Sequence, residues 1–299
     1  MHDPTLAAAA GAHCGGAVDT TFVALGPAKV AFLGVVQGIT ELLPVSSTAH
    51  MRAVPAFLGW PDPGSAFSAA MQLAALAAVV VYFARDLIGV AGGFTRALAG
   101  GDRRTPEFRL GVAIILATIP IAIVGAALSK ILNQCGSPLR TPMVIGVACF
   151  AMAVIMGLAE IVAKHRRDGD RLTYLDAIVI GLAQVFALIP GVSRSGSTLT
   201  GALFLGFKRE DAARVSFLLG VPAIALAGLH ELWQLHKAGL SHQGWEILGI
   251  GLVVSSVSAF IAIWGLMRLL ERFSTWPLVI YRGLFGLVVI AGAYMGWLH

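Results

Sequence analysis

Charged residues are scarce in this sequence. They make up 12% of its 299 residues, whereas about 25% is usual in a soluble domain. The shortage accompanies 57% hydrophobic residues and a mean hydropathy of +0.82. The composition therefore excludes an ordinary soluble domain and indicates a protein of the lipid bilayer.

Cysteines and N-terminal basic residues are also few. Cys14, Cys135 and Cys149 are too scattered for a disulfide or metal framework. A signal peptide begins with a basic region, but no Lys or Arg precedes the first alanines here. We therefore expect residues 1–26 to form a flexible extension. The net charge of +5 is compatible with a nucleic-acid partner, but basic residues at membrane edges usually report orientation, and we expect no nucleic acid.

Apolar residues gather in blocks long enough to span a membrane. A helix of about 20 apolar residues crosses a hydrocarbon core of about 30 Å. Six blocks have about this length, at 66–84, 108–132, 142–163, 210–231, 246–267 and 277–298. We therefore predict an all-α polytopic membrane protein.

Two more apolar segments are interrupted by polar residues, in QGITELLPVSSTAH (37–50) and ALIPGVSRSGSTLTG (187–201). Each contains a proline, which disfavours helix for the residue before it. Broken backbone at membrane depth is tolerated only inside protein or beside a water-filled cavity. We predict re-entrant helical hairpins over 27–59 and 173–206, in which the chain enters and leaves on the same side.

The two interrupted segments resemble each other. Sliding the chain along itself places Pro190 on Pro44 and Ser193 on Ser47, and also superimposes the spans that follow. Chance similarity between apolar segments is the competing explanation. We predict two repeats, 27–164 and 165–299, each a re-entrant hairpin followed by three spans. Three crossings give the second repeat the inverted topology, so that the hairpin tips meet near the midplane.

The distribution of basic residues tests this layout. The poorer face would hold Lys29, Arg52, Lys130, Arg140 and Lys237. The richer face would hold Arg85, Arg96, Arg103, Arg104, Lys164, Arg166, Arg167, Arg171, Lys208, Arg209, Arg268 and Arg272. The richer face is expected to be cytoplasmic, which places both termini and the entrance of the first hairpin outside.

The first predicted tip carries a carboxylate. Glu41 is ionisable at membrane depth, where such a group usually marks a site; a protonated carboxyl bound to a neighbouring helix is the alternative. Gln37 shares a helix face with Glu41, and a hydrogen bond between helices explains it as well as a site role does.

Hydroxyls and a histidine follow in the same tip. Ser46, Ser47 and Thr48 stand where the second helix begins, so they either cap its free N–H groups or help to bind an anion there. His50 lies one turn after Ser47 and is a candidate general base or acid, although a lone histidine is usually structural.

The second predicted tip supplies an arginine among hydroxyls. Arg194 needs an anionic partner at this depth, and its planar fork suits carboxylate or phosphate oxygens. That partner is Glu41, a bound anion, or both. The surrounding hydroxyls belong to Ser193, Ser195, Ser197 and Thr198. The two tips together indicate a pocket for a phosphorylated ligand, and a lipid phosphate suits a site within a bilayer.

These motifs resemble those of the undecaprenyl-diphosphate phosphatase family, also called the bacitracin-resistance proteins. The resemblance covers residues 27–298. It rests on an (E/Q)xxxE pair, here Gln37 and Glu41, which runs into LPVSST.H, and on PGVSRSGST in the second half. Ala49 stands where the family pattern has glycine, and Gln37 is the neutral option of the pair.

The resemblance implies hydrolysis of undecaprenyl diphosphate to the monophosphate at the outer face of the bacterial cytoplasmic (inner) membrane. This reaction recycles the lipid carrier for peptidoglycan and underlies bacitracin resistance. It also implies a divalent cation, magnesium or calcium. With Glu41 as its one carboxylate ligand, the ion would be held largely by diphosphate oxygens and water. The expected partners are the bilayer and the polyprenyl diphosphate, and a homodimer remains open.

The mechanism that we expect is in-line attack on the terminal phosphorus by Ser47. His50 or Glu41 would take the serine proton, while Arg194 and the helix N-termini stabilise the phosphoryl oxygens. Direct attack by His50 is the competing assignment. The residues expected to bind substrate are Gln37, Ser46, Thr48, Ser193, Ser195 and Thr198.

Two other functions stay open at this point. A lipid-phosphate flippase is the main alternative, because transporters also use inverted repeats with broken helices. The acid-phosphatase-like lipid phosphatases share Ser-Arg and Ser-x-x-His fragments. They also need a His-x-x-x-Asp downstream of the Ser-Arg, and none follows Arg194.

Overall fold

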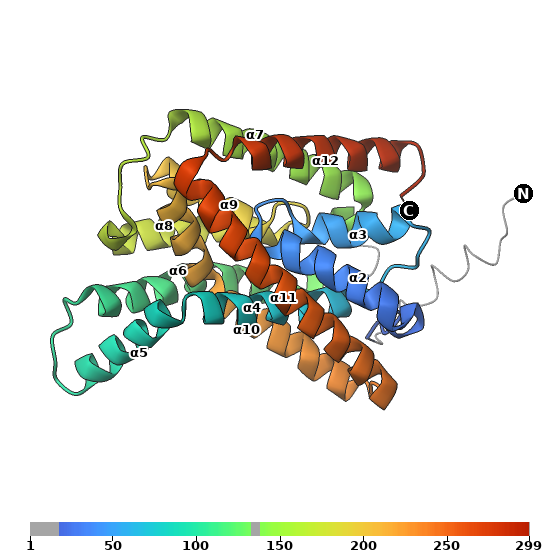
Figure 1. Cartoon of the computed structure of the whole chain (residues 1–299), viewed down its shortest axis with the longest axis horizontal. Coiled ribbons are helices and arrows are strands. Elements are labelled where there is room, and N and C mark those ends of the chain that lie inside the picture. Colours follow the sequence, from blue (N-terminus) through green and yellow to red (C-terminus); the bar gives the residue numbers. More distant parts are fainter. Residues whose placement is uncertain (1–17, 133–137, 299) are drawn as a thin grey trace, which may run out of the picture.

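The computed structural model of the chain describes residues 18–132 and 138–298, apart from the side chains of residues 129–132 and 138. Cys14, Cys135 and most of the predicted extension over 1–26 lie outside the described residues. Within them the chain folds into helices and forms no strand (Figure 1). The predicted all-α class is confirmed.

Each predicted span corresponds to one long helix. They are α4 (Ser65–Tyr82), α6 (Pro106–Leu132), α7 (Pro142–Val162), α10 (Arg209–Lys237), α11 (His242–Arg272) and α12 (Trp276–Tyr294). Together with α2 (Phe22–Leu42), seven helices among the described residues are long and apolar enough to cross a membrane. The chain is therefore a multi-pass membrane protein.

Both interrupted segments form a helix, a break and a second helix. The first consists of α2, an extended turn and α3 (Ser47–Phe57). The second consists of α8 (Tyr174–Val185), a short 3₁₀ turn over Phe186–Leu188, and α9 (Arg194–Phe204). In Figure 1, α2 runs from the right towards the centre and α3 returns to the right, as the re-entrant interpretation requires.

The first hairpin begins earlier than the sequence pattern indicated. α2 starts at Phe22 rather than at residue 27, with a kink at Gly26, whose φ of 74° interrupts the helix just before Pro27. Proline suits the first turn of a helix, so the regular part of α2 still begins at the predicted place.

α2 packs closely against α11. A Cβ atom at Gly38 would collide with the main chain of Ser255 and Ala259, so only glycine allows this approach. Because Gly38 lies between Gln37 and Glu41 in sequence, the contact with α11 fixes the height and rotation of the segment that carries both polar side chains.

One helix was missed by the sequence analysis. α5 (Ala84–Leu98) lies between the first two spans of the first half and packs on α6, where the rings of Phe94 and Phe108 are 4.9 Å apart. Its charged and small residues make it too polar for a span, so hydropathy alone did not distinguish it from a loop.

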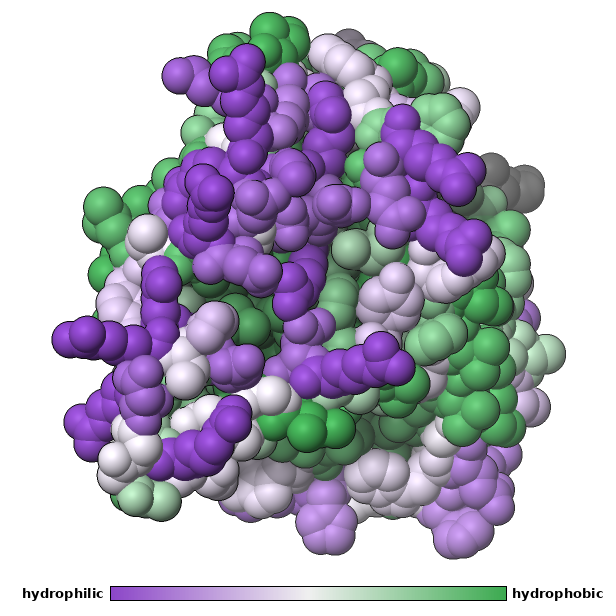
Figure 2. Space-filling model, turned by 60° about the vertical axis from the view of Figure 1, so that its left-hand side comes forward, coloured by the Kyte–Doolittle hydropathy of each residue, from purple (hydrophilic) through white to green (hydrophobic). Residues whose placement is uncertain are grey.

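Basic side chains gather at one end of the molecule. Exposed arginines and lysines come from α5, the turn before α6, the α7–α8 connection and the end of α11, all at the left in Figure 1. Figure 2 shows hydrophilic side chains over this face. Some are paired: Lys208 Nζ lies 2.6 Å from Asp168 Oδ1, and this hydrogen bond lowers the pKa of Asp168. The basic residues that were predicted to share a face therefore cluster.

Candidate functional site

The two breaks end in the same helix cap. Ser46 precedes α3 and accepts a hydrogen bond from Ala49 N at 3.4 Å, and Ser193 precedes α9 and accepts one from Gly196 N at 3.2 Å. Both serines have a positive φ, 74° and 68°, which is uncommon for a residue other than glycine. Backbone strain of this kind tends to cluster at functional sites, where the surroundings hold it in place.

The shared cap corrects the predicted alignment of the two tips. Ser193 corresponds to Ser46, not to Ser47, because the second tip contains one extra residue, Gly191, with a φ of 98°. The first helical residues are therefore Ser47 in α3 and Arg194 in α9. The candidate nucleophile and the candidate phosphate clamp occupy the same position in the two hairpins.

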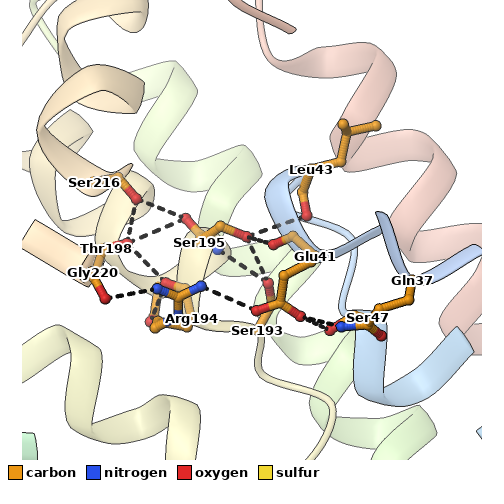
Figure 3. A network of polar contacts seen from close by, with 12 residues as sticks. Gln37, Glu41, Leu43, Ser47, Ser193, Arg194, Ser195, Thr198, Ser216 and Gly220 are labelled. Atoms are coloured by element: carbon orange, nitrogen blue, oxygen red, sulfur yellow. Dashed lines mark hydrogen bonds and ion pairs between the residues drawn. The ribbon is translucent and has the colours of Figure 1, made fainter. Parts of the chain in front are cut away.

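Glu41 connects the two tips (Figure 3). Its Oε2 accepts hydrogen bonds from Gln37 Nε2 at 3.0 Å and from Ser47 Oγ at 2.5 Å. Its Oε1 accepts one from Arg194 Nη2 at 3.0 Å, and Arg194 Nη1 donates to the carbonyl of Gly220 at 3.2 Å. The Glu41 side chain is 5% exposed and that of Arg194 is 14% exposed, so this ion pair is largely withdrawn from solvent.

The hydroxyls of the second tip mainly hold the backbone. Ser195 Oγ donates to the carbonyls of Glu41 and Leu43, both at 3.2 Å, and lies 3.2 Å from Ser193 Oγ. Thr198 Oγ1 lies 2.8 Å from the Arg194 carbonyl and also bonds to Ser216 Oγ. The predicted meeting of the tips is thus present, while the inverted symmetry of the repeats remains a prediction.

His50 is turned towards α12. Its Nδ1 lies 2.8 Å from the Ser46 carbonyl, which can only accept, so Nδ1 carries a proton. In the neutral ring Nε2 then accepts from the Tyr281 hydroxyl at 2.7 Å. The ring also stacks on Phe285 with a centroid distance of 3.8 Å. The group beside the Ser47 hydroxyl is Glu41, and the lone pair of His50 Nε2 is used by the Tyr281 hydroxyl.

Thr48 differs from its neighbours. It is exposed, whereas Ser46 is buried and Ser47 is half-buried. The structure brings Gln37, Glu41, Ser47, Arg194 and the serines of the second tip into one network. It leaves Thr48 at the outer side of the first turn of α3.

Sequence reasoning missed Arg282, which lies in the middle of α12 and is fully buried. Its guanidinium donates to the carbonyls of Pro44 and Gly191, both at 2.8 Å, to that of Cys149 at 3.1 Å, and to that of Val192. Pro44 and Gly191 belong to different tips, so one side chain ties both breaks together. The sequence does show an arginine within the apolar block 277–298. A charged residue at membrane depth usually has a function, so Arg282 could have been identified as a candidate from this pattern.

The tips form a suitable anion site. The N-termini of α3 and α9 meet there, and the first N–H groups of a helix together with its dipole attract negative charge. Arg194 adds a guanidinium, and Arg282 adds a buried positive charge behind the loops. A phosphate group could replace Glu41 as the partner of Arg194.

The same residues offer little to a metal ion. Among the described residues, no three His, Cys, Asp or Glu side chains lie close enough together to hold one. Glu41 is the one carboxylate of the network, and the groups bonded to it are the neutral Gln37 amide and Ser47 hydroxyl and the Arg194 guanidinium. This donor set fits a divalent cation that arrives with a diphosphate, and not one held by the protein alone.

Comparison with known proteins gives a consistent result. Residues 30–288 match the family model described as bacitracin resistance protein BacA. The chain is 64% identical over 262 residues to undecaprenyl-diphosphatase 2 of Mesorhizobium japonicum, which covers 88% of this chain and 99% of the relative. It is 52% identical over 258 residues to the undecaprenyl-diphosphatase of Gloeobacter violaceus, which covers 86% of this chain and 89% of the relative.

We predict that Arg282→Met destabilises the protein strongly. The substitution leaves the carbonyls of both tips buried without donors, and each such group costs about 1–3 kcal/mol. The unfolding temperature of the purified protein in detergent should fall by several degrees. Arg272→Met, at the exposed end of α11, is the matched control and should unfold near the wild-type temperature. Equal unfolding temperatures for the two variants would show that the tips do not depend on Arg282.

Proposed function

Because the chain belongs to the bacitracin resistance protein BacA family, we propose that it hydrolyses undecaprenyl diphosphate to undecaprenyl phosphate and inorganic phosphate. The relatives named undecaprenyl-diphosphatase match it over most of their length. The observation that carries the proposal is the Ser47 hydroxyl 2.5 Å from the Glu41 carboxylate, at a helix N-terminus that faces Arg194. A flippase needs no such hydroxyl–carboxylate pair, so this contact favours the enzyme.

The reaction begins when the terminal phosphate competes with Glu41 for Arg194. Release from the ion pair makes Glu41 a stronger base towards the Ser47 proton. Ser47 Oγ attacks the terminal phosphorus, its proton passes to Glu41, and the bond to the bridging oxygen breaks. Undecaprenyl phosphate leaves with that electron pair.

Water then attacks the phosphoserine. The phosphorus–Oγ bond breaks, Ser47 Oγ recovers a proton from Glu41, and inorganic phosphate is released. Throughout, Arg194 and the N–H groups of the two helix N-termini stabilise the phosphoryl oxygens. Ser195 and Thr198 act mainly by holding the tips in register.

His50 positions the first tip in this mechanism. Its ring locks Ser46 and Tyr281 in place on one side of α3, so its loss should misalign Ser47 without removing the nucleophile. Glu41 and Gln37 would hold a divalent cation that arrives with the diphosphate, and the cation would neutralise charge on the phosphate oxygens.

The site is proposed to open to the outside of a bacterial cytoplasmic membrane. The clustered basic residues mark the cytoplasmic face by the positive-inside rule, and the first hairpin then enters from the opposite side. Hydrolysis there returns the lipid carrier to peptidoglycan synthesis.

We predict that Ser47→Ala abolishes phosphate release while binding of the diphosphate lipid is largely kept, because Arg194 and the helix N-termini remain. His50→Ala should slow turnover but still allow phosphate to be trapped on Ser47. The measurements are phosphate release by purified protein and mass spectrometry after acid quench. Phosphate trapped on His50, or substantial turnover by Ser47→Ala, would reassign the nucleophile.

A second prediction concerns the wall behind Arg194. A Cβ atom at Gly220 would collide with Arg194 Nη1, so Gly220→Ala should displace the guanidinium and lower kcat/KM by about tenfold or more. The loss would come from the displaced guanidinium and not from a weakened helix, because alanine is a better helix former than glycine. Gly249→Ala, where a Cβ meets open space, is the control and should retain wild-type kinetics. Wild-type kinetics in Gly220→Ala would show that the reaction does not depend on the position of the Arg194 guanidinium.

Orientation can be tested in intact cells. In a background without Cys14, Cys135 and Cys149, Arg103→Cys should resist a membrane-impermeant thiol reagent because it lies on the basic face. His242→Cys, at the exposed first residue of α11 and at the opposite end of the molecule, should react. The reverse labelling pattern would place the basic face outside and overturn the proposed direction of the site.

A further inference from the structure

An apolar groove runs along α11 beside the polar site. It has a volume of about 780 Å³. It lies between the C-terminal part of α2, residues 253–269 of α11 and the start of α12. Its walls include Val35, Ile39, Val257, Ile261 and Leu278. Among the described residues that line it, Ser258 alone has a polar side chain, and its hydroxyl is bonded to main-chain carbonyls of Val254, Ser255 and Gly34.

Leu43 joins this groove to the polar network. Its carbonyl accepts the hydrogen bond from Ser195, and it stands two residues after Glu41. Its side chain lines the groove. Figure 3 shows that side chain turned away from the Glu41 carboxylate. The groove-lining residues Val35, Ile39 and Leu43 share one face of α2, and Gln37 and Glu41 share the opposite face. The two meet where α2 ends, since the Leu43 carbonyl accepts the hydrogen bond from Ser195. A molecule with its polar end at Glu41 and Arg194 would therefore reach the groove around this turn.

The groove is open on its lipid side. Val257 and Ile261 are 58% and 61% exposed, although each contributes to the wall. In a bilayer such side chains face hydrocarbon, so a chain can enter sideways without crossing water. Ser258, Ala262 and Gly265 recur on one face of α11 and line the groove with small side chains.

We propose that this groove binds the isoprenoid chain of the polyprenyl diphosphate whose head occupies the tips. The inference rests on the proposed function and specifies how the same site recognises its substrate. The tail comes from lipid and not from water, so its binding gains packing contacts and no hydrophobic transfer. The groove therefore aligns the head and selects the methyl-branched chain over straight acyl chains, and it adds little to overall affinity.

Gly265 allows a direct test, because a Cβ atom there meets nothing within 4 Å and a larger side chain can grow into the groove. Gly249 is the matched control: it is another half-buried glycine of α11 with open space around it, and it does not line the groove. Replacing either glycine raises helix propensity, so loss of folding is not expected.

Gly265→Leu should lower kcat/KM for the C55 polyprenyl diphosphate about tenfold, the scale at which a pocket discriminates by small changes in apolar shape. Gly249→Leu should leave it unchanged. Equal kinetics for Gly265→Leu and the wild type would contradict the proposal. Failure of the wild type to release phosphate would instead reject the proposed function.

Cross-linking gives a readout that does not need turnover. Gly265 or Gly249 is replaced by photoreactive benzoylphenylalanine, and the protein is irradiated in nanodiscs that contain phospholipid and an isotopically labelled C55 polyprenyl phosphate. The expected result is a polyprenyl adduct at position 265, lost when excess unlabelled polyprenyl diphosphate is added, and phospholipid adducts alone at 249. Phospholipid adducts alone at 265 would show that ordinary acyl chains fill the groove and would overturn the inference.

Discussion

The structure depends on how broken backbone is satisfied inside a membrane. Hydrocarbon offers no partner to a free carbonyl or N–H group, so a helix can be interrupted there only if protein supplies each hydrogen bond. Arg282 does this for the carbonyls of both breaks, and the Ser46 and Ser193 hydroxyls cap amide groups on the other side of each break. The carbonyls of Pro44, Gly191 and Val192 thus point towards α12.

The two buried arginines have different partners and different roles. Arg282 is enclosed by main-chain carbonyls and serves the protein, whereas Arg194 is paired with a carboxylate that a ligand can replace. A buried ion pair is weak evidence for stability, because desolvation offsets much of its attraction. In the proposed mechanism the Glu41–Arg194 pair is the closed state of the site, which a phosphate opens by replacing Glu41 as the partner of Arg194.

Ser47 and Arg194 occupy the same position in the two hairpins, as the first helical residue after the cap. The same backbone geometry therefore presents a different functional group in each tip. Both residues begin a helix after a serine with positive φ, and both side chains bond to the Glu41 carboxylate. One provides a hydroxyl beside a carboxylate and the other a guanidinium. The groove at Leu43 extends this plan, since the same turn that presents Glu41 also presents an apolar wall to the bilayer.

The sequence by itself determined the class of fold and most members of the site. Blocks of apolar residues decide which segments lie in lipid, and the rare polar groups within them identify the tips, because burying such groups without a purpose is costly. Only the tertiary structure decided how those groups pair. Ser47 meets Glu41 and His50 meets Tyr281 because of the rotation of α3 against α2 and α12, which local spacing does not encode. Arg282 and the alignment of Ser46 with Ser193 likewise depend on contacts between segments far apart in the chain, where side-chain geometry, and not residue order, sets the partner.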